Sequence, residues 1–335
     1  MSVRAYWVSR PGEGELREEP VSAAPAPGRS LVQAAFSGVS AGTERLVGLG
    51  LVPESCAAPM SCRYMAGDFR LPIKYGYDLV GTGVAGALEG LRVFSMHPHQ
   101  ELCEIADDDA VVLPDALPSS RAVLVPNAET ALNAVWDAEL EPSDRPLVVG
   151  GGSVGLLVAH ALRSAASVEH VSLVEADEQR ATFARELPWI DEVLSPVDVE
   201  RESVTVAFHA SGSSAGLQTA LDAVGFEGRV VELSWYGEKP VTLDLGTGFH
   251  YARKRLIASQ VGSVAPAKRA THTHADRLRE VLELLTDEAL DRLLSRPVPF
   301  DRMPDLMADV YRGNAPAPVP LVSYEACSAS PSKTT

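Results

Sequence analysis

Three glycines and one glutamate between positions 150 and 175 have types and a spacing with chemical meaning. Gly150, Gly152 and Gly155 form the pattern G-x-G-x-x-G, and Glu175 follows 20 residues after the last of them. The first glycine allows a tight turn, the second lets the backbone approach a pyrophosphate, and the third lets a helix pack closely. A carboxylate at that distance can accept hydrogen bonds from both hydroxyls of a ribose. The pattern therefore predicts a dinucleotide site.

The elements that must position these residues are also present in the sequence. An apolar strand, Leu147–Val149, precedes the glycines, a helix runs from Val154 to about Ala165, and a second strand, Val171–Val174, ends at the glutamate. The first helical N–H groups, at Ser153 and Val154, and the positive end of the helix dipole would hold the phosphates. A tight turn that binds nothing is the alternative, and the complete strand–helix–strand context disfavours it.

Glu175 also predicts which dinucleotide binds. Its negative charge would repel a ribose 2′-phosphate, which favours NAD over NADP. Arg180, five residues later, could instead accept such a phosphate. We therefore expect NAD, with NADP as the less favoured cofactor.

The alternation of strands and helices continues after this motif. Its members are the strands Val204–Ala210, Arg229–Leu233 and Arg255–Val261 and the helix Ala215–Val224. Such alternation predicts a doubly wound parallel sheet, which binds ligands at the carboxyl ends of its strands. Ser211, Ser234 and Ser259 follow three of these ends, so we expect them beside the cofactor. His209, at another strand end, could handle a proton there or could simply be a satisfied hydrogen-bonding residue.

The segments on either side of this region have a different character. Short β-like runs between glycines and prolines predict a small antiparallel domain, and a helix of about Ser119 to Glu139 follows it. The expected runs are Ser30–Phe36, Val80–Val84, Leu102–Ala106 and Ala110–Leu113, with a helix at Ala275–Leu285 and strands at Arg296–Phe300 and Pro320–Tyr324 near the end. The expected division is 1–121, 122–262 for the dinucleotide domain, 263–325 for a return to the first domain, and a disordered tail at 326–335.

Composition limits the classes of protein and of partner. A chain of 335 residues suggests about two domains, and a net charge of −16 argues against a nucleic-acid surface. No apolar window approaches the ~18 residues of a membrane span, and the start lacks the apolar core of a signal peptide. We therefore expect a cytoplasmic protein that acts on a small molecule. The four cysteines are scattered and match neither a disulfide framework nor a zinc knuckle.

Several segments resemble, in order, the medium-chain dehydrogenase/reductase superfamily, the alcohol dehydrogenase-like proteins. They are PGEGELREEPVSAAPAPGRSLVQAAFSGVS, KYGYDLVGTG, LVPNAETALNAVW and GRVVELSWYGEKPVTLDL. The resemblance implies an α/β protein with a GroES-like antiparallel β domain and a Rossmann domain. It also implies a homodimer that pairs through the edge strand of the Rossmann domain, here Arg255–Val261.

The positions that carry catalytic zinc in this family differ here. The resemblance places Ser40, Tyr77 and Pro126 or Asn127 where zinc enzymes have Cys, His and Cys. Zinc prefers thiolate, imidazole or carboxylate ligands, so the chain resembles a zinc-free branch and no metal is expected. The pair His97 and His99, with Cys103 or Asp78, and the pair His272 and His274 are alternative metal ligands. Such pairs in polar loops are more often solvated surface residues.

Without zinc, another group must donate or accept the proton on the reacting oxygen. Tyr77 and Asp78 come first, because the resemblance places them at the positions of the lost His and Glu. Lys74 could lower the pKa of Tyr77, although Tyr77 could also be a packing residue and Lys74 a solvated one. Thr43 and Glu44 lie beside the former first ligand, where Glu44 could act as a base or pair with an arginine.

The expected function is a zinc-independent, NAD(P)-dependent oxidoreductase that interconverts a secondary alcohol and a carbonyl by hydride transfer. The closest alternative is reduction of an activated C=C bond, as in quinone and enoyl reductases, which needs only stabilisation of an enolate. The polar residues Lys74, Tyr77, Asp78 and His209 favour alcohol chemistry. An alternative of another class is a non-catalytic protein that binds the dinucleotide.

Overall fold

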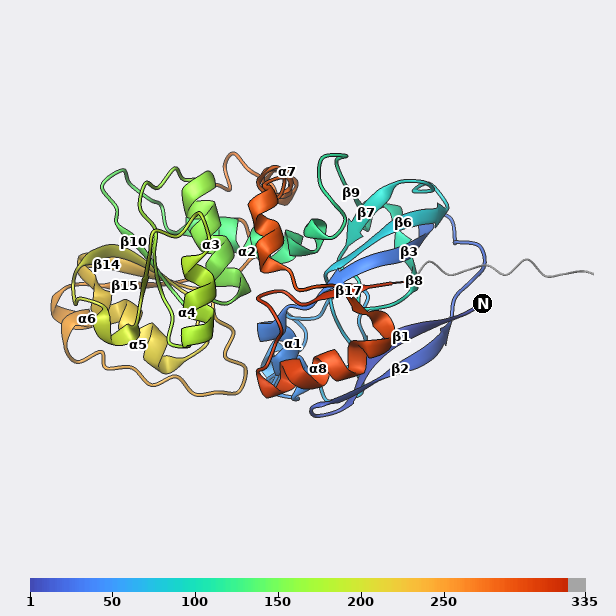
Figure 1. Cartoon of the computed structure of the whole chain (residues 1–335), viewed down its shortest axis with the longest axis horizontal. Helices are drawn as coiled ribbons and strands as arrows, with labels where there is room; N and C mark the ends of the chain where they lie inside the picture. Colours follow the sequence, from blue (N-terminus) through green and yellow to red (C-terminus); the bar gives the residue numbers. More distant parts are fainter. Residues whose placement is uncertain (325–335) are drawn as a thin grey trace, which may run out of the picture. The chain divides into compact units, whose positions relative to one another are not determined.

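The computed structural model describes residues 1–324 and divides them into two units. The first unit consists of Met1–Leu124 together with the chain from Leu293 to Tyr324, and the second is Val125–Arg292 (Figure 1). Residues 263–292, which the sequence-based division assigned to the first domain, lie in the second unit. The tail expected to be disordered, 326–335, lies outside the described residues.

The second unit contains a six-stranded parallel sheet in the order β12-β11-β10-β13-β14-β15. Its strands are β10 (Pro146–Val149), β11 (Ser172–Val174), β12 (Glu192–Leu194), β13 (Val204–His209), β14 (Val224–Glu232) and β15 (Arg255–Ala258). Numbered along the chain, this order is 3-2-1-4-5-6, the order of the dinucleotide-binding doubly wound fold. The prediction of a parallel sheet is confirmed.

The helices of this unit connect and cover the strands. They are α2 (Val125–Asp137), α3 (Ser153–Ser164), α4 (Glu178–Arg185), α5 (Ser214–Ala223), α6 (Gly248–Tyr251) and α7 (His274–Leu284). The helix predicted from Ser119 begins later, because a 3-10 turn, Arg121–Leu124, precedes α2. Pro126 explains the boundary, since proline is tolerated in the first turn of a helix, where the N–H has no acceptor.

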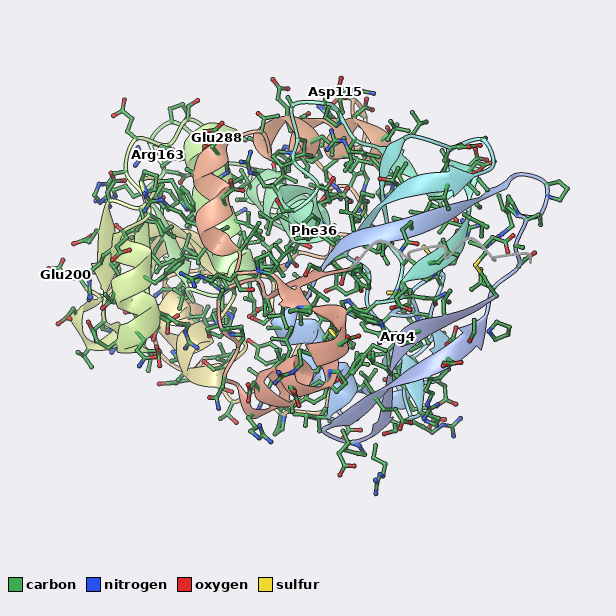
Figure 2. The ribbon with its side chains drawn as sticks, turned by 45° about the vertical axis from the view of Figure 1, so that its right-hand side comes forward. Arg4, Phe36, Asp115, Arg163, Glu200 and Glu288 are labelled. Atoms are coloured by element: carbon green, nitrogen blue, oxygen red, sulfur yellow. The ribbon has the colours of Figure 1, made fainter. Side chains whose placement is uncertain are left out.

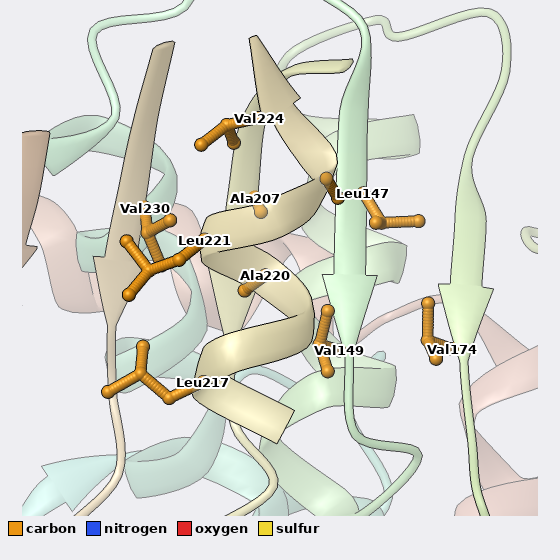
Figure 3. Close-up of a cluster of buried hydrophobic side chains, with 10 residues drawn as sticks. Leu147, Val149, Val174, Ala207, Leu217, Ala220, Leu221, Val224 and Val230 are labelled. Carbon is orange, nitrogen blue, oxygen red and sulfur yellow. The ribbon is translucent and has the colours of Figure 1, made fainter. Parts of the chain in front are cut away.

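The core under helix α5 fixes the strands that carry the dinucleotide motif. Leu217 and Leu221 of α5 belong to one buried cluster with Leu147 and Val149 of β10 and Val230 of β14 (Figure 3). All five side chains are at most 3% exposed. Burying side chains of this size contributes roughly 1.5–3 kcal/mol each, so the strand ends are held firmly.

The first unit contains two further sheets. One has the order β2-β1-β5-β4, and the other has the order β16-β17-β3-β6-β7-β9, with β8 also paired to β3. The strands are β1 (Ser2–Arg10), β2 (Glu13–Pro20), β3 (Arg29–Gly38), β4 (Ala66–Gly67), β5 (Ile73–Lys74), β6 (Leu79–Ala85), β7 (Arg92–Ser95), β8 (Leu102–Ala106), β9 (Val111–Val112), β16 (Val298–Pro299) and β17 (Leu321–Ser323). Only the β16–β17 pair is parallel, so the expected antiparallel character is confirmed.

The segment after residue 293 is held by side chains from the start of the chain. Tyr311 of α8 (Met303–Arg312) hydrogen-bonds Tyr6 across 3.1 Å, and its carbonyl accepts from Arg45 Nε of α1 (Ala41–Gly48) at 2.9 Å. A Cβ on Gly48 would lie 2.1 Å from the Tyr311 ring, so the close approach of α1 and α8 requires glycine. Arg4 of β1, labelled in Figure 2, binds Asp301. Segments from both ends of the described residues, 1–324, therefore build this unit.

The helices between residues 1 and 324 include none with both the length and the apolar character needed to cross a membrane.

Candidate active site

The three glycines of the motif occupy the turn between β10 and α3, and the turn requires glycine at two of the three positions. Gly150 has φ of +112°, and a Cβ there would lie 2.8 Å from the backbone of Ser211. A Cβ on Gly155 would lie 1.9 Å from the carbonyl oxygen of Gly150, so the helix α3 could not approach the strand with any side chain there. Gly152, the residue that caps α3, would place its Cβ in open space. Packing requires the first and third glycines, and the open side of the second fits a pyrophosphate.

Glu175 lies directly beside this turn at the end of β11. Its carboxylate is buried and accepts three hydrogen bonds, from Gly151 N at 2.8 Å, Asp177 N at 2.8 Å and Arg180 Nη2 at 3.0 Å. Each carboxylate oxygen has two lone pairs, so accepting capacity remains for a ribose hydroxyl. Arg180 is largely exposed and stands next to the acid that it neutralises. Both residues lie where the sequence predicts the adenosine ribose.

A second polar cluster lies at the ends of the neighbouring strands β13 and β14. His209 is fully buried; its Nδ1 is 2.8 Å from Glu232 Oε2 and its Nε2 is 2.6 Å from Ser211 Oγ. Glu232 also accepts from Tyr236 OH at 2.9 Å and from Ser234 N at 2.7 Å. Burial acts to raise the pKa of Glu232, but the hydrogen bond and charge of His209 outweigh it, and the pKa is lowered. Glu232 is therefore ionised at neutral pH.

The other two serines predicted beside the cofactor also lie at strand ends, Ser234 after β14 and Ser259 after β15. Ser234 Oγ accepts from Gly212 N at 3.1 Å, and Ser259 Oγ donates to Asp137 at 2.7 Å. Each hydroxyl thus has a partner within the second unit. They stabilise the loops, while their contact with a cofactor stays a prediction.

In the first unit, a buried chain of hydrogen bonds begins at Glu44. Its Oε1 accepts from Ser40 N at 2.9 Å, and its Oε2 is 3.0 Å from His99 Nε2. The other ring nitrogen of His99 is 2.8 Å from Ser37 Oγ, which is 2.9 Å from Tyr324 OH. His99 and Ser37 are fully buried, and Glu44 is 4% exposed. Among the contacts described for Glu44, the basic partner is His99. The predicted pairing of Glu44 with an arginine is therefore wrong.

Asp78 is the most unusual group of this region. It is fully buried, and within residues 1–324 neither of its carboxyl oxygens has a hydrogen-bond partner. Burial, followed by the charge of Glu44, raises the pKa of Asp78 well above its usual range. The group therefore carries a proton at neutral pH. A buried acid without a partner is suited to donate that proton to a ligand oxygen.

Tyr77 is half-buried and neutral. Burial, and then the charge of Asp78, raise its pKa, while hydrogen bonding with the hydroxyls of Ser40 and Thr43 acts in the opposite direction. Lys74 does not lower this pKa as we expected. Its ammonium group instead binds Glu19 at 2.6 Å and the side chain of Gln100 at 2.8 Å. The proposed effect of Lys74 on Tyr77 is thus wrong, because Glu19 and Gln100 hold the ammonium group.

The donors in this region do not fit a zinc ion. Ser40 and Tyr77 offer neutral hydroxyls, and Pro126 offers no side-chain donor, whereas zinc prefers thiolate, imidazole or carboxylate. Throughout the described part of the chain, no three His, Cys, Asp or Glu side chains are grouped so that they could hold a metal ion.

The histidines considered as alternative metal ligands make other contacts. His97 and His99 are buried, so the prediction that they are solvated is wrong. His97 Nδ1 lies 2.9 Å from the carbonyl of Pro98, and Cys103 contacts the carbonyl of Val32. His274, which is exposed, reaches the carbonyl of Gly262 at 3.2 Å.

Two residues of these clusters were missed by sequence reasoning. Glu232 ends the strand next to that of His209, so the strand-end argument that selected His209 also selects Glu232. His99 was considered only as a metal ligand. Its partner Glu44 lies 55 residues earlier in the chain, and nothing in the sequence indicates that separation.

No family model matches the chain. Its relatives in sequence are zinc-type alcohol dehydrogenase-like proteins. The chain is 27% identical over 211 residues to the uncharacterised zinc-type alcohol dehydrogenase-like protein YphC of Escherichia coli, covering 60% of this chain and 58% of the relative. It is 28% identical over 205 residues to the (R,R)-butanediol dehydrogenase of Bacillus subtilis, covering 49% and 59%. The chain spans 58% to 66% of the length of the curated relatives that it matches.

Solved structures show the same fold. An Escherichia coli alcohol dehydrogenase in complex with NADH has a TM-score of 0.75 at 14% identity, covering 96% of this chain and 99% of that one. The 2R,3R-butanediol dehydrogenase of Bacillus subtilis has a TM-score of 0.73 at 18% identity, with the same coverage. A Sinorhizobium meliloti zinc-binding dehydrogenase with bound NADP has a TM-score of 0.74 at 18% identity, again covering 96% and 99%. The prediction of a GroES-like antiparallel domain joined to a Rossmann domain is confirmed.

Proposed function

We propose that the chain is a zinc-independent, NAD(P)-dependent oxidoreductase that interconverts a secondary alcohol and a carbonyl by hydride transfer. The observation that carries the proposal is the glycine turn at Gly150–Gly155 with Glu175 beside it. Packing demands Gly150 and Gly155, whereas Gly152 faces open space, as contact with a pyrophosphate requires. The relatives named as alcohol and butanediol dehydrogenases support the same reaction class.

The nicotinamide, when bound, supplies or accepts the hydride. The chain must then move a proton on the reacting oxygen, and the first unit holds a neutral acid for this purpose. Asp78 carries a buried proton with no acceptor among the described residues, and Tyr77 is a neutral hydroxyl beside it. In carbonyl reduction Asp78 donates its proton and Tyr77 donates a hydrogen bond; in alcohol oxidation the proton returns to Asp78. His209 of the second unit is a further candidate for proton transfer.

Independence from zinc forms part of the proposal, although relatives are named zinc-type. It rests on the chemistry of Ser40 and Tyr77 at the expected ligand positions and on the pairing of Glu44 with His99. A preference for NAD rests on Glu175, whose negative charge disfavours a 2′-phosphate. Arg180 opposes this preference only in part, because Glu175 already pairs with it.

We also propose a homodimer that pairs through β15, with the cytoplasm as the expected location. Strand β15 is the edge of the six-stranded sheet, and its Leu256 is 42% exposed. An edge strand presents unpaired backbone groups that a second copy can pair.

The experiment is a titration of metal-stripped protein with NADH and with NADPH, followed by nicotinamide fluorescence and thermal unfolding. We expect tighter binding of NADH, and weaker binding in Glu175→Ala by about tenfold or more, since hydrogen bonds to a charged group contribute roughly 1.5–3 kcal/mol. Glu178→Ala, a change of an exposed glutamate on α4, is the matched control and should bind as the wild type does. Failure of the wild type to bind either cofactor would overturn the proposal.

A further inference from the structure

Three side chains at the ends of β13 and β14 have the arrangement of a nucleophile, a base and an orienting acid. Ser211 Oγ is 2.6 Å from His209 Nε2, and His209 Nδ1 is 2.8 Å from Glu232 Oε2. Since Glu232 is ionised and can only accept, Nδ1 of His209 donates to it. In the tautomer that carries its proton on Nδ1, Nε2 is an acceptor that faces the hydroxyl of Ser211 at 2.6 Å. These are the roles that define a serine triad, whatever the fold that carries it.

The solvent exposure of the three residues also fits these roles. Ser211 is exposed to solvent, whereas His209 is fully buried and the side chain of Glu232 is 12% exposed. The orienting acid is held by two further donors, Tyr236 OH at 2.9 Å and Ser234 N at 2.7 Å. The residue that would attack a ligand is therefore the most exposed of the three, and hydrogen bonds hold the base and its acid in place.

Helix α5 has a glycine, Gly216, where it packs beside Ser211 and His209. A Cβ on Gly216 would lie 2.1 Å from Ser211 Oγ and 3.0 Å from His209 Nε2. Any side chain at position 216 would thus displace the serine hydroxyl from the histidine. The N–H groups of Ser214 and Ala215, in the first turn of the same helix, have no acceptor within it. They are donors of the kind that stabilise an oxyanion.

From this geometry we propose that Ser211, His209 and Glu232 form a catalytic triad, and that the second unit hydrolyses small carboxylic esters through an acyl-Ser211 intermediate. This activity is separate from hydride transfer and does not rest on the proposed function. Its substrate class is an ester with a good leaving group and a short acyl chain.

The chemistry balances with water as the only co-reactant. Ser211 Oγ attacks the carbonyl carbon while its proton passes to His209 Nε2, and the new Oγ–C bond gives a tetrahedral oxyanion. The C–O bond to the alcohol breaks, and His209 returns the proton to that leaving group. Water then attacks the acyl-serine, gives its proton to His209, and the carboxylic acid leaves as Ser211 recovers the proton. Glu232 stabilises the imidazolium in both halves.

The test uses the full chain with two probes, p-nitrophenyl acetate and a fluorophosphonate. We expect release of p-nitrophenolate, and a single fluorophosphonate adduct that peptide mass spectrometry places on Ser211. Ser211→Ala and His209→Gln should each reduce hydrolysis by about a hundredfold. Gly216→Ala should do the same without changing any triad residue. Ser195→Ala, which removes the hydroxyl of an exposed serine of the second unit outside the triad and the first turn of α5, should hydrolyse the ester at the wild-type rate.

The outcome does not depend on how well the variants fold, because the adduct is mapped on the wild type. Circular dichroism of each variant separates loss of activity from loss of structure. An adduct elsewhere or none at all, or unchanged hydrolysis by Ser211→Ala, would overturn the triad and leave His209 as a buried hydrogen-bonding residue. NADH binding, measured on the same wild-type sample, tests the proposed function independently of either result.

Discussion

At the scale of single residues, Gly152 and Gly155 share one turn but are required for different reasons. We predict that Gly155→Ala lowers the free energy of unfolding by about 1–3 kcal/mol, because its Cβ would overlap the carbonyl of Gly150. Gly152→Ala has room for its methyl group and an extended backbone, so its stability should change by a few tenths of a kcal/mol. Its NADH binding should nevertheless be lost, since the methyl group occupies the approach to the pyrophosphate.

The two glycine variants are measured together by urea denaturation and by NADH titration. Each serves as the control of the other, because both add one methyl group to the same turn. A Gly152→Ala protein that binds NADH as tightly as the wild type would show that the pyrophosphate does not approach this turn.

Asp78 makes stability depend on pH in a specific direction. Its pKa is raised on folding, so the folded chain holds a proton that the unfolded chain loses as pH rises. The stabilising effect of that proton is complete below the unfolded pKa, about 3.9, and decreases as pH rises toward the folded value. Between pH 5 and 7 we predict that the wild type loses stability relative to Asp78→Asn, by up to about 1.4 kcal/mol per pH unit.

This comparison uses the difference between the two proteins in denaturant unfolding at each pH. Taking this difference cancels the contributions of the titrating groups that the substitution leaves unaffected. Asp108→Asn, in an exposed turn, should show no such pH-dependent difference from the wild type. A constant difference between Asp78→Asn and the wild type would mean that Asp78 is ionised when the protein is folded.

At the scale of elements, helix α7 begins with a reciprocal cap. Thr273 Oγ1 accepts from Asp276 N at 3.2 Å, and Asp276 Oδ2 accepts from Thr273 N at 2.9 Å. We predict that Thr273→Ala lowers the free energy of unfolding by about 1 kcal/mol, measured by thermal or denaturant unfolding. Thr271→Ala, two residues earlier and outside the helix, should change stability much less. Equal stabilities of Thr273→Ala and the wild type would mean that the cap makes no net contribution to the free energy of unfolding.

The elements that the sequence predicted correctly have strong local signals. Strand β10, the glycine turn and α3 lie within 20 residues, and apolar runs, glycines and helical spacing agree there. Strand β2 was missed because EGELREEP has few apolar residues, and its stability comes from pairing with β1 across the whole strand. Local propensity cannot predict a strand that depends on its partner.

The candidate site could be predicted only in part, for the same reason. His209 was found from its place at a strand end, but its contact with Glu232 requires β13 and β14 to be neighbours in the sheet. The pairing of Glu44 with His99 joins a helix to a distant loop. Burial of Asp78 and the resulting proton come from packing, which the sequence does not specify residue by residue.

At the scale of the whole molecule, the exposed edge of β15 leads to a prediction about assembly. A charge on an edge strand opposes pairing with another strand. Leu256→Glu should therefore convert the proposed dimer into a monomer of 35.6 kDa, measured by sizing with light scattering at micromolar concentration. Val197→Glu, a change at an apolar residue that is 88% exposed and lies off this strand, should leave the dimer intact. A wild-type protein that is already monomeric would contradict the dimer itself.

The first unit is assembled from both ends of the described chain, and this has a consequence for synthesis on the ribosome. Strand β3 must pair with β17, which is made almost 300 residues later. The second unit, Val125–Arg292, is contiguous and has all its strands once residue 292 has emerged. The nascent chain can therefore complete its second unit before its first, and one edge of β3 stays open to unwanted partners until residues 321–323 have emerged.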